Sequence, residues 1–236
     1  MNLKIIAMEP GSAVSHILEL YDNKPIKEKM RLLLNSRLMD IVPVNNLPKF
    51  FASGRLIDIN AGEMLSLGVI GVYYNLLDSH KSKSYQVVVG IDDSAKTSIE
   101  NVLSDGAIWD NQQKQKMPFQ QVMVQGYFPP KEVNEDFVIE AINDKIRRRN
   151  DYPNHCGLLV SIYGDKGAIN FKKIIDICDL DKFDIVFAVV YRLPELTKAI
   201  VARLDKSLTL EVFMQNTKNF SLDRFPRTGK WAIRAG

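Results

Sequence analysis

Three acidic side chains stand at the ends of predicted elements of this chain. Glu63 opens the apolar stretch Ala61–Leu77, and Asp92 and Asp93 follow the valine-rich stretch Tyr85–Ile91. Because the carboxyl ends of strands face the ligand crevice in an open α/β sheet, we expect these acids to line such a crevice. Adjacent carboxylates repel one another unless a cation lies between them, and Mg²⁺ or Mn²⁺ prefers such oxygen ligands. A metal held there could activate water and stabilise the leaving oxygen of a phosphodiester.

The stretches IDINAGEMLSLG and YQVVVGIDDSAKTSIENVL resemble the PIN-domain nucleases. In that family an acid in a GE helix start and a DD pair after a central apolar strand help to bind the metal. The resemblance covers residues 1–110 and implies that Glu63, Asp92 and Asp93 are catalytic and metal-binding. The family has an Asp after its first strand, where this chain has Glu9, a longer side chain that could also be a ligand. The alternative interpretation is that these acids cap helices and favour their dipoles.

A second region begins at Asp105, a further candidate metal ligand, and resembles the PD-(D/E)XK nucleases over residues 105–210. That outline has an Asp before a hairpin, then a strand with a second acid and a lysine two residues on. Here Gln121 stands where the acid should be and Met123 where the lysine should be. The resemblance therefore implies a region that binds rather than cuts. The alternative is that both are ordinary residues of a mixed strand.

Basic residues are concentrated in the last part of the chain. The formal net charge is +3, but residues 1–140 hold 14 Lys and Arg against 17 Asp and Glu, and residues 141–236 hold 17 against 11. Clustered positive charge attracts phosphate backbones, because binding releases counterions. A solvated basic face and tail is the alternative. The residues that we expect to contact nucleic acid are Lys145, Arg147, Arg148, Arg149, Arg224, Arg227 and Lys230.

Length and composition exclude several classes of protein. The 236 residues are 46% hydrophobic and 25% charged, which is typical of a globular chain. No apolar run reaches 18 residues, so no transmembrane helix is expected, and the start MNLKIIAMEPGS lacks the features of a secretory signal. Two cysteines supply neither a disulfide framework nor a cysteine zinc site. We therefore expect a cytoplasmic protein without a membrane partner.

The pattern of apolar stretches predicts an α/β protein made of two layered halves, residues 1–110 and 111–236, with mixed or mostly parallel sheets. The segment NQQKQK after Asp110 is interpreted as a polar linker. The predicted strands are Leu3–Met8, Asp40–Val44, Tyr85–Ile91, Phe119–Gln125, Gly157–Tyr163, Phe183–Tyr191 and Ser207–Met214. The predicted helices are Ser12–Tyr21, Ile26–Leu38, Ala61–Leu77, Ser94–Leu103, Asn134–Arg149, Asn170–Leu180 and Pro194–Leu204.

Two hypotheses about function follow. The first is a metal-dependent nuclease, a hydrolase that uses Mg²⁺ or Mn²⁺ to cut phosphodiester bonds of RNA or DNA, or a degenerate descendant of one. The second is a non-catalytic interaction or regulatory module on a nuclease-like fold, with a protein or a second copy of the chain as partner. Glu9 in place of an Asp, together with Gln121 and Met123, favours the second.

Overall fold

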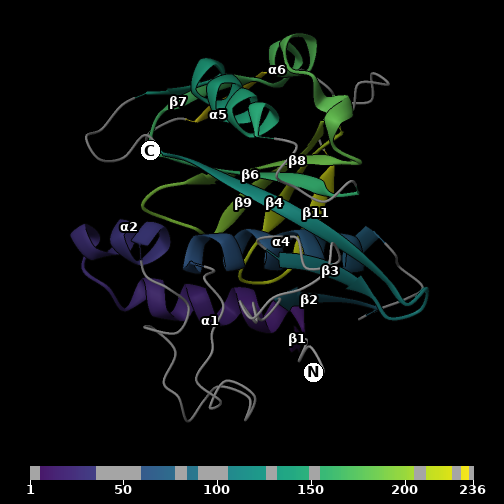
Figure 1. The fold of residues 1–236 in the computed structure, drawn as a ribbon. Coiled ribbons are helices and arrows are strands. Elements are labelled where there is room, and N and C mark those ends of the chain that lie inside the picture. Colours follow the sequence, from purple (N-terminus) through teal and green to yellow (C-terminus); the bar gives the residue numbers. More distant parts are fainter. Residues whose placement is uncertain are drawn as a thin grey trace. The chain divides into compact units, whose positions relative to one another are not determined.

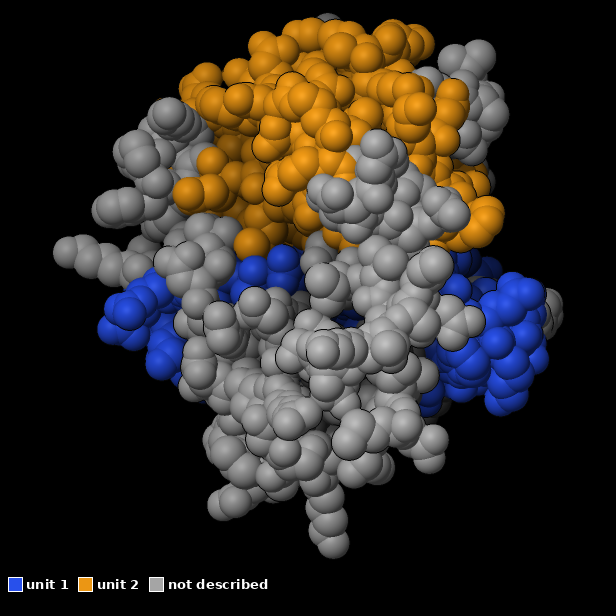
Figure 2. Space-filling model, in the orientation of Figure 1, with its two compact units in different colours: residues 1–119, 152–154 blue, residues 120–151, 155–236 orange. Residues whose placement is uncertain are grey.

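The computed structural model describes residues 6–35, 60–77, 84–89, 106–125, 132–148, 155–204, 211–224 and 230–233. The chain forms two compact units, coloured separately in Figure 2. Unit 1 comprises residues 1–119 and 152–154, and unit 2 comprises residues 120–151 and 155–236. The predicted strand Asp40–Val44 and helix Ser94–Leu103 lie outside the described residues.

Unit 1 combines three described helices with an antiparallel meander of strands (Figure 1). Strand β2 pairs with β1 on one side and with β3 on the other, and β3 pairs with the first half of β4, every pair being antiparallel. The elements are β1 (Ile6–Met8), α1 (Pro10–Asp22), α2 (Ile26–Asn35), α4 (Ala61–Leu77), β2 (Tyr85–Val89), β3 (Gly106–Asp110) and β4 (Gln115–Gln125), and β4 continues into unit 2.

Helix α4 is the core of unit 1 and has the bounds that its apolar sequence predicts. It is buried continuously from Ala61 to Tyr73 except at Glu63, because it packs against α1, α2, β2 and β3. Two glycines allow the close approach of α1. A Cβ on Gly68 would lie 2.8 Å from Cγ2 of Val14, and one on Gly71 would lie 2.7 Å from Cγ of Pro10.

The polar segment after Asp110 is a tight hairpin and not a linker. Strands β3 and β4 pair up to Asp110 and Gln115, leaving a loop of four residues, 111–114. The carboxylate of Asp110 accepts hydrogen bonds from the backbone N–H groups of Gln112 (2.7 Å) and Gln113 (3.1 Å). Lys114 completes the turn in the left-handed region, with φ of 56°. A polar side chain therefore takes the place of the glycine that usually marks such a turn.

Unit 2 contains a mixed sheet, a small second sheet and two helices. In the mixed sheet the strand order is β4-β6-β8-β9-β10-β11, and the small sheet has the order β12-β7-β5. The elements are β5 (Val133–Asn134), α5 (Glu135–Arg147), β6 (Gly157–Gly164), β7 (Gly167–Asn170), α6 (Phe171–Ile177), the 3-10 helix η5 (Leu180–Lys182), β8 (Val186–Arg192), β9 (Lys198–Leu204), β10 (Glu211–Asn216), β11 (Ser221–Arg224) and β12 (Lys230–Ile233).

The predicted α/β class with mixed sheets is confirmed. Strands β6 and β8 are parallel and buried along almost their whole length, which explains their continuous apolar sequences. The predicted helix Pro194–Leu204 is wrong, because Lys198–Leu204 forms β9 and pairs antiparallel with both β8 and β10. Helices α5 and α6 lie together on one side of this sheet (Figure 1). None of the described helices is long and apolar enough to cross a membrane.

The approach of α1 to α4 gives a test of the packing of unit 1. Alanine at Gly68 favours the helix by about 1 kcal/mol, but its methyl group would overlap Cγ2 of Val14 at 2.8 Å. We expect Gly68→Ala to lower the free energy of unfolding by about 1–2 kcal/mol, measured by urea denaturation. In a Val14→Ala background, which lacks the overlapping atom, the same substitution should cost clearly less. Equal costs in both backgrounds would contradict this packing.

Candidate functional site

The candidate acidic site in unit 1 depends on the direction in which α4 lies along β2. Near the end of α4, the side chain of Asn75 donates to the carbonyl oxygen of Tyr85 (3.2 Å) and accepts from its N–H group (3.0 Å). One turn earlier, a Cβ on Gly71 would lie 3.5 Å from Val87. Moving back along the helix therefore means moving forward along the strand. The first turn of α4, which carries Glu63, points toward the carboxyl end of β2.

The sheet register places the start of β3 at the same end of the sheet as the carboxyl end of β2. Val88 pairs with Ala107 and Tyr85 pairs with Asp110, so the carboxyl end of β2 lies beside Gly106, the first residue of β3. In the sequence, Asp92 and Asp93 follow the end of β2, and Asp105 immediately precedes Gly106. All three aspartates lie outside the described residues. The described elements thus bring together the places where the chain leaves toward Asp92 and returns from Asp105.

Glu63 itself forms a capping box at the start of α4. Its Oε2 accepts a hydrogen bond from the backbone N–H of Asn60 (2.9 Å), and its own N–H donates to Oδ1 of Asn60 (2.9 Å). This reciprocal pair satisfies two N–H groups at the helix start. The interpretation of Glu63 as a first-turn helix acid therefore holds in this structure.

Glu9 caps α1, which begins at Pro10, two residues before the predicted start at Ser12. The Glu9 carboxylate accepts from the N–H groups of Gly11 (3.0 Å) and Ser12 (2.6 Å) and from the Ser12 hydroxyl (2.8 Å). The next residue, Pro10, packs against α4 at Gly68 and Gly71. These glycines lie about 8–12 Å along the helix axis from Glu63, at 1.5 Å per residue. Glu9 therefore caps α1 at a position beside α4.

Among the described residues, no three His, Cys, Asp or Glu side chains gather in a group that could hold a metal ion. Strand β4 carries the two motif positions without charge. Gln121 is buried, at 2% exposure, and Met123 is partly buried. Both lie on one face of the strand, since alternate residues share a face. The described structure therefore adds no carboxylate at these positions of β4.

The predicted basic residues lie on several elements of unit 2. Arg147 and Arg148 at the end of α5 are exposed and both pair with Asp144, Arg148 at 3.5 Å. The hydrogen bond from Arg147 and the positive charges of both guanidinium groups lower the pKa of Asp144. Lys145 is partly buried on the same helix. Of the remaining residues, Arg224 ends β11 and Lys230 begins β12, while Arg149 and Arg227 lie outside the described residues.

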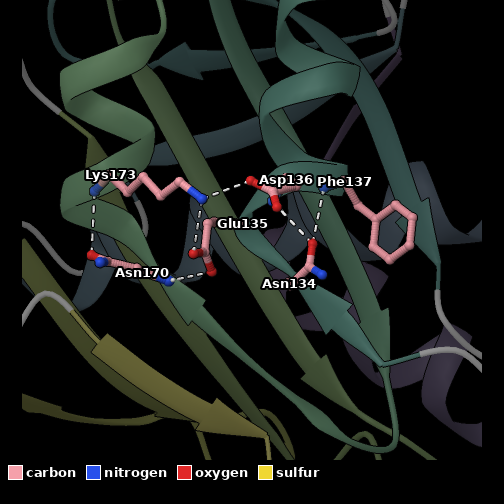
Figure 3. A network of polar contacts seen from close by, with 6 residues as sticks. All are labelled: Asn134, Glu135, Asp136, Phe137, Asn170 and Lys173. Atoms are coloured by element: carbon pink, nitrogen blue, oxygen red, sulfur yellow. Dashed lines mark hydrogen bonds and ion pairs between the residues drawn. The ribbon is translucent and has the colours of Figure 1, made fainter.

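A polar network that the sequence analysis missed joins the starts of α5 and α6 (Figure 3). Lys173 Nζ lies 3.3 Å from Oε1 of Glu135 and 2.7 Å from Oδ1 of Asp136. Glu135 also accepts from the N–H of Asn170 at 3.4 Å. Asn134 and Asn170, which the sequence analysis took as the first residues of two helices, are the caps of α5 and α6. Lys173 lies 38 and 37 residues after Glu135 and Asp136 in the sequence, so these ion pairs could be recognised only in the folded structure.

This network shifts the titration of both charged partners. Burial raises the pKa of Glu135, but its hydrogen bonds from backbone N–H groups and from Lys173 outweigh that effect and lower the pKa below its usual 4.5. Hydrogen bonds to Asp136 and Glu135 raise the pKa of Lys173 above its usual 10.5. Each charged form is therefore favoured by folding. The network stabilises unit 2 at neutral pH by joining the starts of α5 and α6. We call the three residues Glu135, Asp136 and Lys173 the clamp.

Comparison of the chain with family models, with curated proteins and with solved structures gives no match.

The clamp predicts a pH dependence of stability. Folding lowers the pKa of Glu135, so the ionised carboxylate stabilises the folded state. This stability is lost when the carboxylate becomes protonated, as the pH falls below about 4.5. We expect Lys173→Met to lower the Tm by about 1–3 °C at pH 7, since the pair is partly exposed, and by less at pH 3. Lys172→Met is the matched control, because Lys172 pairs only within α6, with Asp176 at 3.0 Å. A loss that is the same at pH 3 and pH 7 would argue against the clamp.

The two roles open to Glu63 can be separated by substitution. Glutamine at this position keeps the capping box, because its amide oxygen accepts the Asn60 N–H, but it lacks the negative charge. We expect Glu63→Gln to leave the Tm nearly unchanged and Glu63→Ala to cost about 1 kcal/mol of stability. If the acidic end binds a cation, both variants should weaken Mn²⁺ binding in calorimetric titration. Glu9→Gln, the same change at the cap of α1, is the control and should not.

Proposed function

We propose that the chain is a metal-dependent nuclease, with its Mg²⁺ or Mn²⁺ site at the acidic end of unit 1. The observation that carries the proposal is the meeting of three element ends: the first turn of α4, the carboxyl end of β2 and the start of β3. Acids stand at each of these in the sequence, namely Glu63, the pair Asp92 and Asp93, and Asp105. Three or four carboxylates from separate elements would repel one another without a cation.

The residues would have the following roles in the proposed reaction. Two or three of the carboxylates would hold the metal, which would supply Lewis-acid activation of a water molecule and stabilisation of charge on the leaving oxygen. The basic residues of unit 2, including Arg147 and Arg148, contact phosphates without reading sequence. The arrangement of Asp105 immediately before the β3–β4 hairpin supports the resemblance to the PD-(D/E)XK nucleases.

A specific observation favours a second candidate, a non-catalytic module on the same fold. The motif positions of β4 hold the neutral Gln121 and Met123, and neither can replace a lysine that positions the attacking water. Such a module would bind nucleic acid or a protein partner without cutting. The two candidates make opposite predictions about metal-dependent cleavage.

The test is cleavage of nucleic acid by the full chain. We expect Mn²⁺ or Mg²⁺ to support cleavage of a labelled substrate, chosen from single- and double-stranded DNA and RNA. Asp105→Asn and Asp92→Asn should each lower the rate at least 100-fold, because each removes a metal charge while keeping the side-chain shape. Asp78→Asn is the control, at an acid that lies between α4 and β2 in the sequence and is not one of the proposed ligands.

The outcomes separate the two candidates. Metal binding that depends on Asp105, without cleavage of any substrate, would favour the non-catalytic module. Absence of both metal binding and cleavage would reject the nuclease. Unchanged cleavage by both Asp→Asn variants would place the activity elsewhere.

A further inference from the structure

The β3–β4 hairpin tip has the chemistry of a surface that binds nucleic acid. The tip comprises residues 111–116, with the sequence NQQKQK, and every side chain in it can donate a hydrogen bond. Residues 112–116 are all exposed, and partial burial of the Lys116 ammonium lowers its pKa. The nearest acid, Asp110, accepts at Oδ1 from the N–H groups of Gln112 and Gln113, so its carboxylate is bound by the turn. The tip therefore carries two lysines, and the carboxylate at its base is hydrogen-bonded to backbone N–H groups.

The hairpin is also held in a defined shape. The N–H of Asn111 donates to the carbonyl oxygen of Ser84 at 2.8 Å, which ties the loop to the residue before β2. Lys114 occupies the left-handed region, and the strands below it pair in register from Gln115 down to Phe119. A preorganised element loses little conformational freedom when it binds.

We propose that this hairpin tip enters the major groove of double-stranded DNA and is the sequence-reading element of the proposed nuclease. The inference rests on the proposed function. The B-DNA major groove is about 12 Å wide and admits a two-stranded β-ribbon. Glutamine and asparagine amides can form paired hydrogen bonds with adenine, and lysine binds guanine or phosphate. The major groove of duplex RNA is too narrow for such a ribbon, so the substrate class is duplex DNA.

The length of β3 gives the distance between the hairpin tip and the start of the strand, next to Asp105. Asp105 precedes β3, and the tip begins after Asp110, five residues further on. An extended strand covers about 17 Å over that length, which equals about five base pairs of B-DNA at 3.4 Å each. The bases that the tip contacts should therefore lie at most about five base pairs from the phosphate that is cut.

Unit 2 contains a matched control hairpin, β10–β11. Its loop, residues 217–220, is also four residues long, and Oδ1 of Asn216 accepts from the N–H groups of Lys218 (3.0 Å) and Asn219 (3.1 Å). Phe220 takes the left-handed position, with φ of 47°. The two turns share their geometry but not their side chains. Lys218→Ala therefore tests the loss of one lysine from an equivalent turn.

The experiment measures binding of the full chain to a 25-base-pair DNA duplex by fluorescence anisotropy, with Ca²⁺ in place of Mg²⁺ to prevent cleavage. The test variant combines Lys114→Gly, which suits the left-handed position, with Lys116→Gln. We expect at least tenfold weaker binding and a salt slope lower by about 1–2, since up to two phosphate or base contacts are lost. Lys218→Ala should remain within twofold of the unchanged chain.

A cross-link measures the spacing directly. Gln112→Cys carries a photoactivatable group, and selective labelling is feasible because Cys156 and Cys178 are both buried. Cross-links to bases within about five base pairs of the cleaved phosphate would support the proposal. Cross-links only to bases further away, or to no base, would overturn it.

The remaining outcomes separate this proposal from the nuclease itself. If the unchanged chain cuts DNA and the hairpin variant binds equally well, the hairpin proposal fails and the nuclease stands. If the hairpin variant loses affinity for duplex RNA and not for DNA, the assigned substrate is wrong. If the unchanged chain neither binds nor cuts nucleic acid, while Asp105-dependent metal binding persists, both proposals fail.

Discussion

The attachment of α4 to β2 determines which ends of the unit 1 elements meet. The helix is apolar on nearly all sides, so its burial alone would tolerate either direction along the strand. The Asn75 amide removes that freedom, because it satisfies both backbone groups of Tyr85 at the first residue of β2. Gly68 and Gly71 leave room for α1. The first turn of α4, with Glu63, can then lie only toward the carboxyl end of β2.

Antiparallel pairing of the strands changes which acidic residues are expected at the same end of the sheet. In a parallel sheet, acids that follow successive strands line one edge, which is how the PIN resemblance groups Glu9 with Asp92. In the antiparallel meander of β1, β2 and β3, the end of one strand meets the start of the next. In the sequence, Asp92 follows β2 by three residues and Asp105 directly precedes β3, and the register brings these two strand ends together.

The sequence predicted the elements with strong local signals and missed those that depend on long-range pairing. Ala61–Leu77 was predicted to its final bounds, because an apolar run of that length with an acid in its first turn suits only a buried helix. The apolar residues of Lys198–Leu204 suit either a helix or a strand, and pairing with β8 and β10 decides for the strand. The β3–β4 turn was missed because Lys114 replaces the glycine that would have signalled it.

The site shows the same division between local and long-range information. Residue types and spacing were enough to single out Glu63 and the acids around it, but not the capping box that Glu63 forms with Asn60. They also could not show that Gln121 is buried in β4. With no lysine at position 123, the proposed nuclease would depend on its metal ion for the acidity of an attacking water. Catalysis by such a site would therefore depend more on the number of carboxylates that hold the ion than on any side chain of β4.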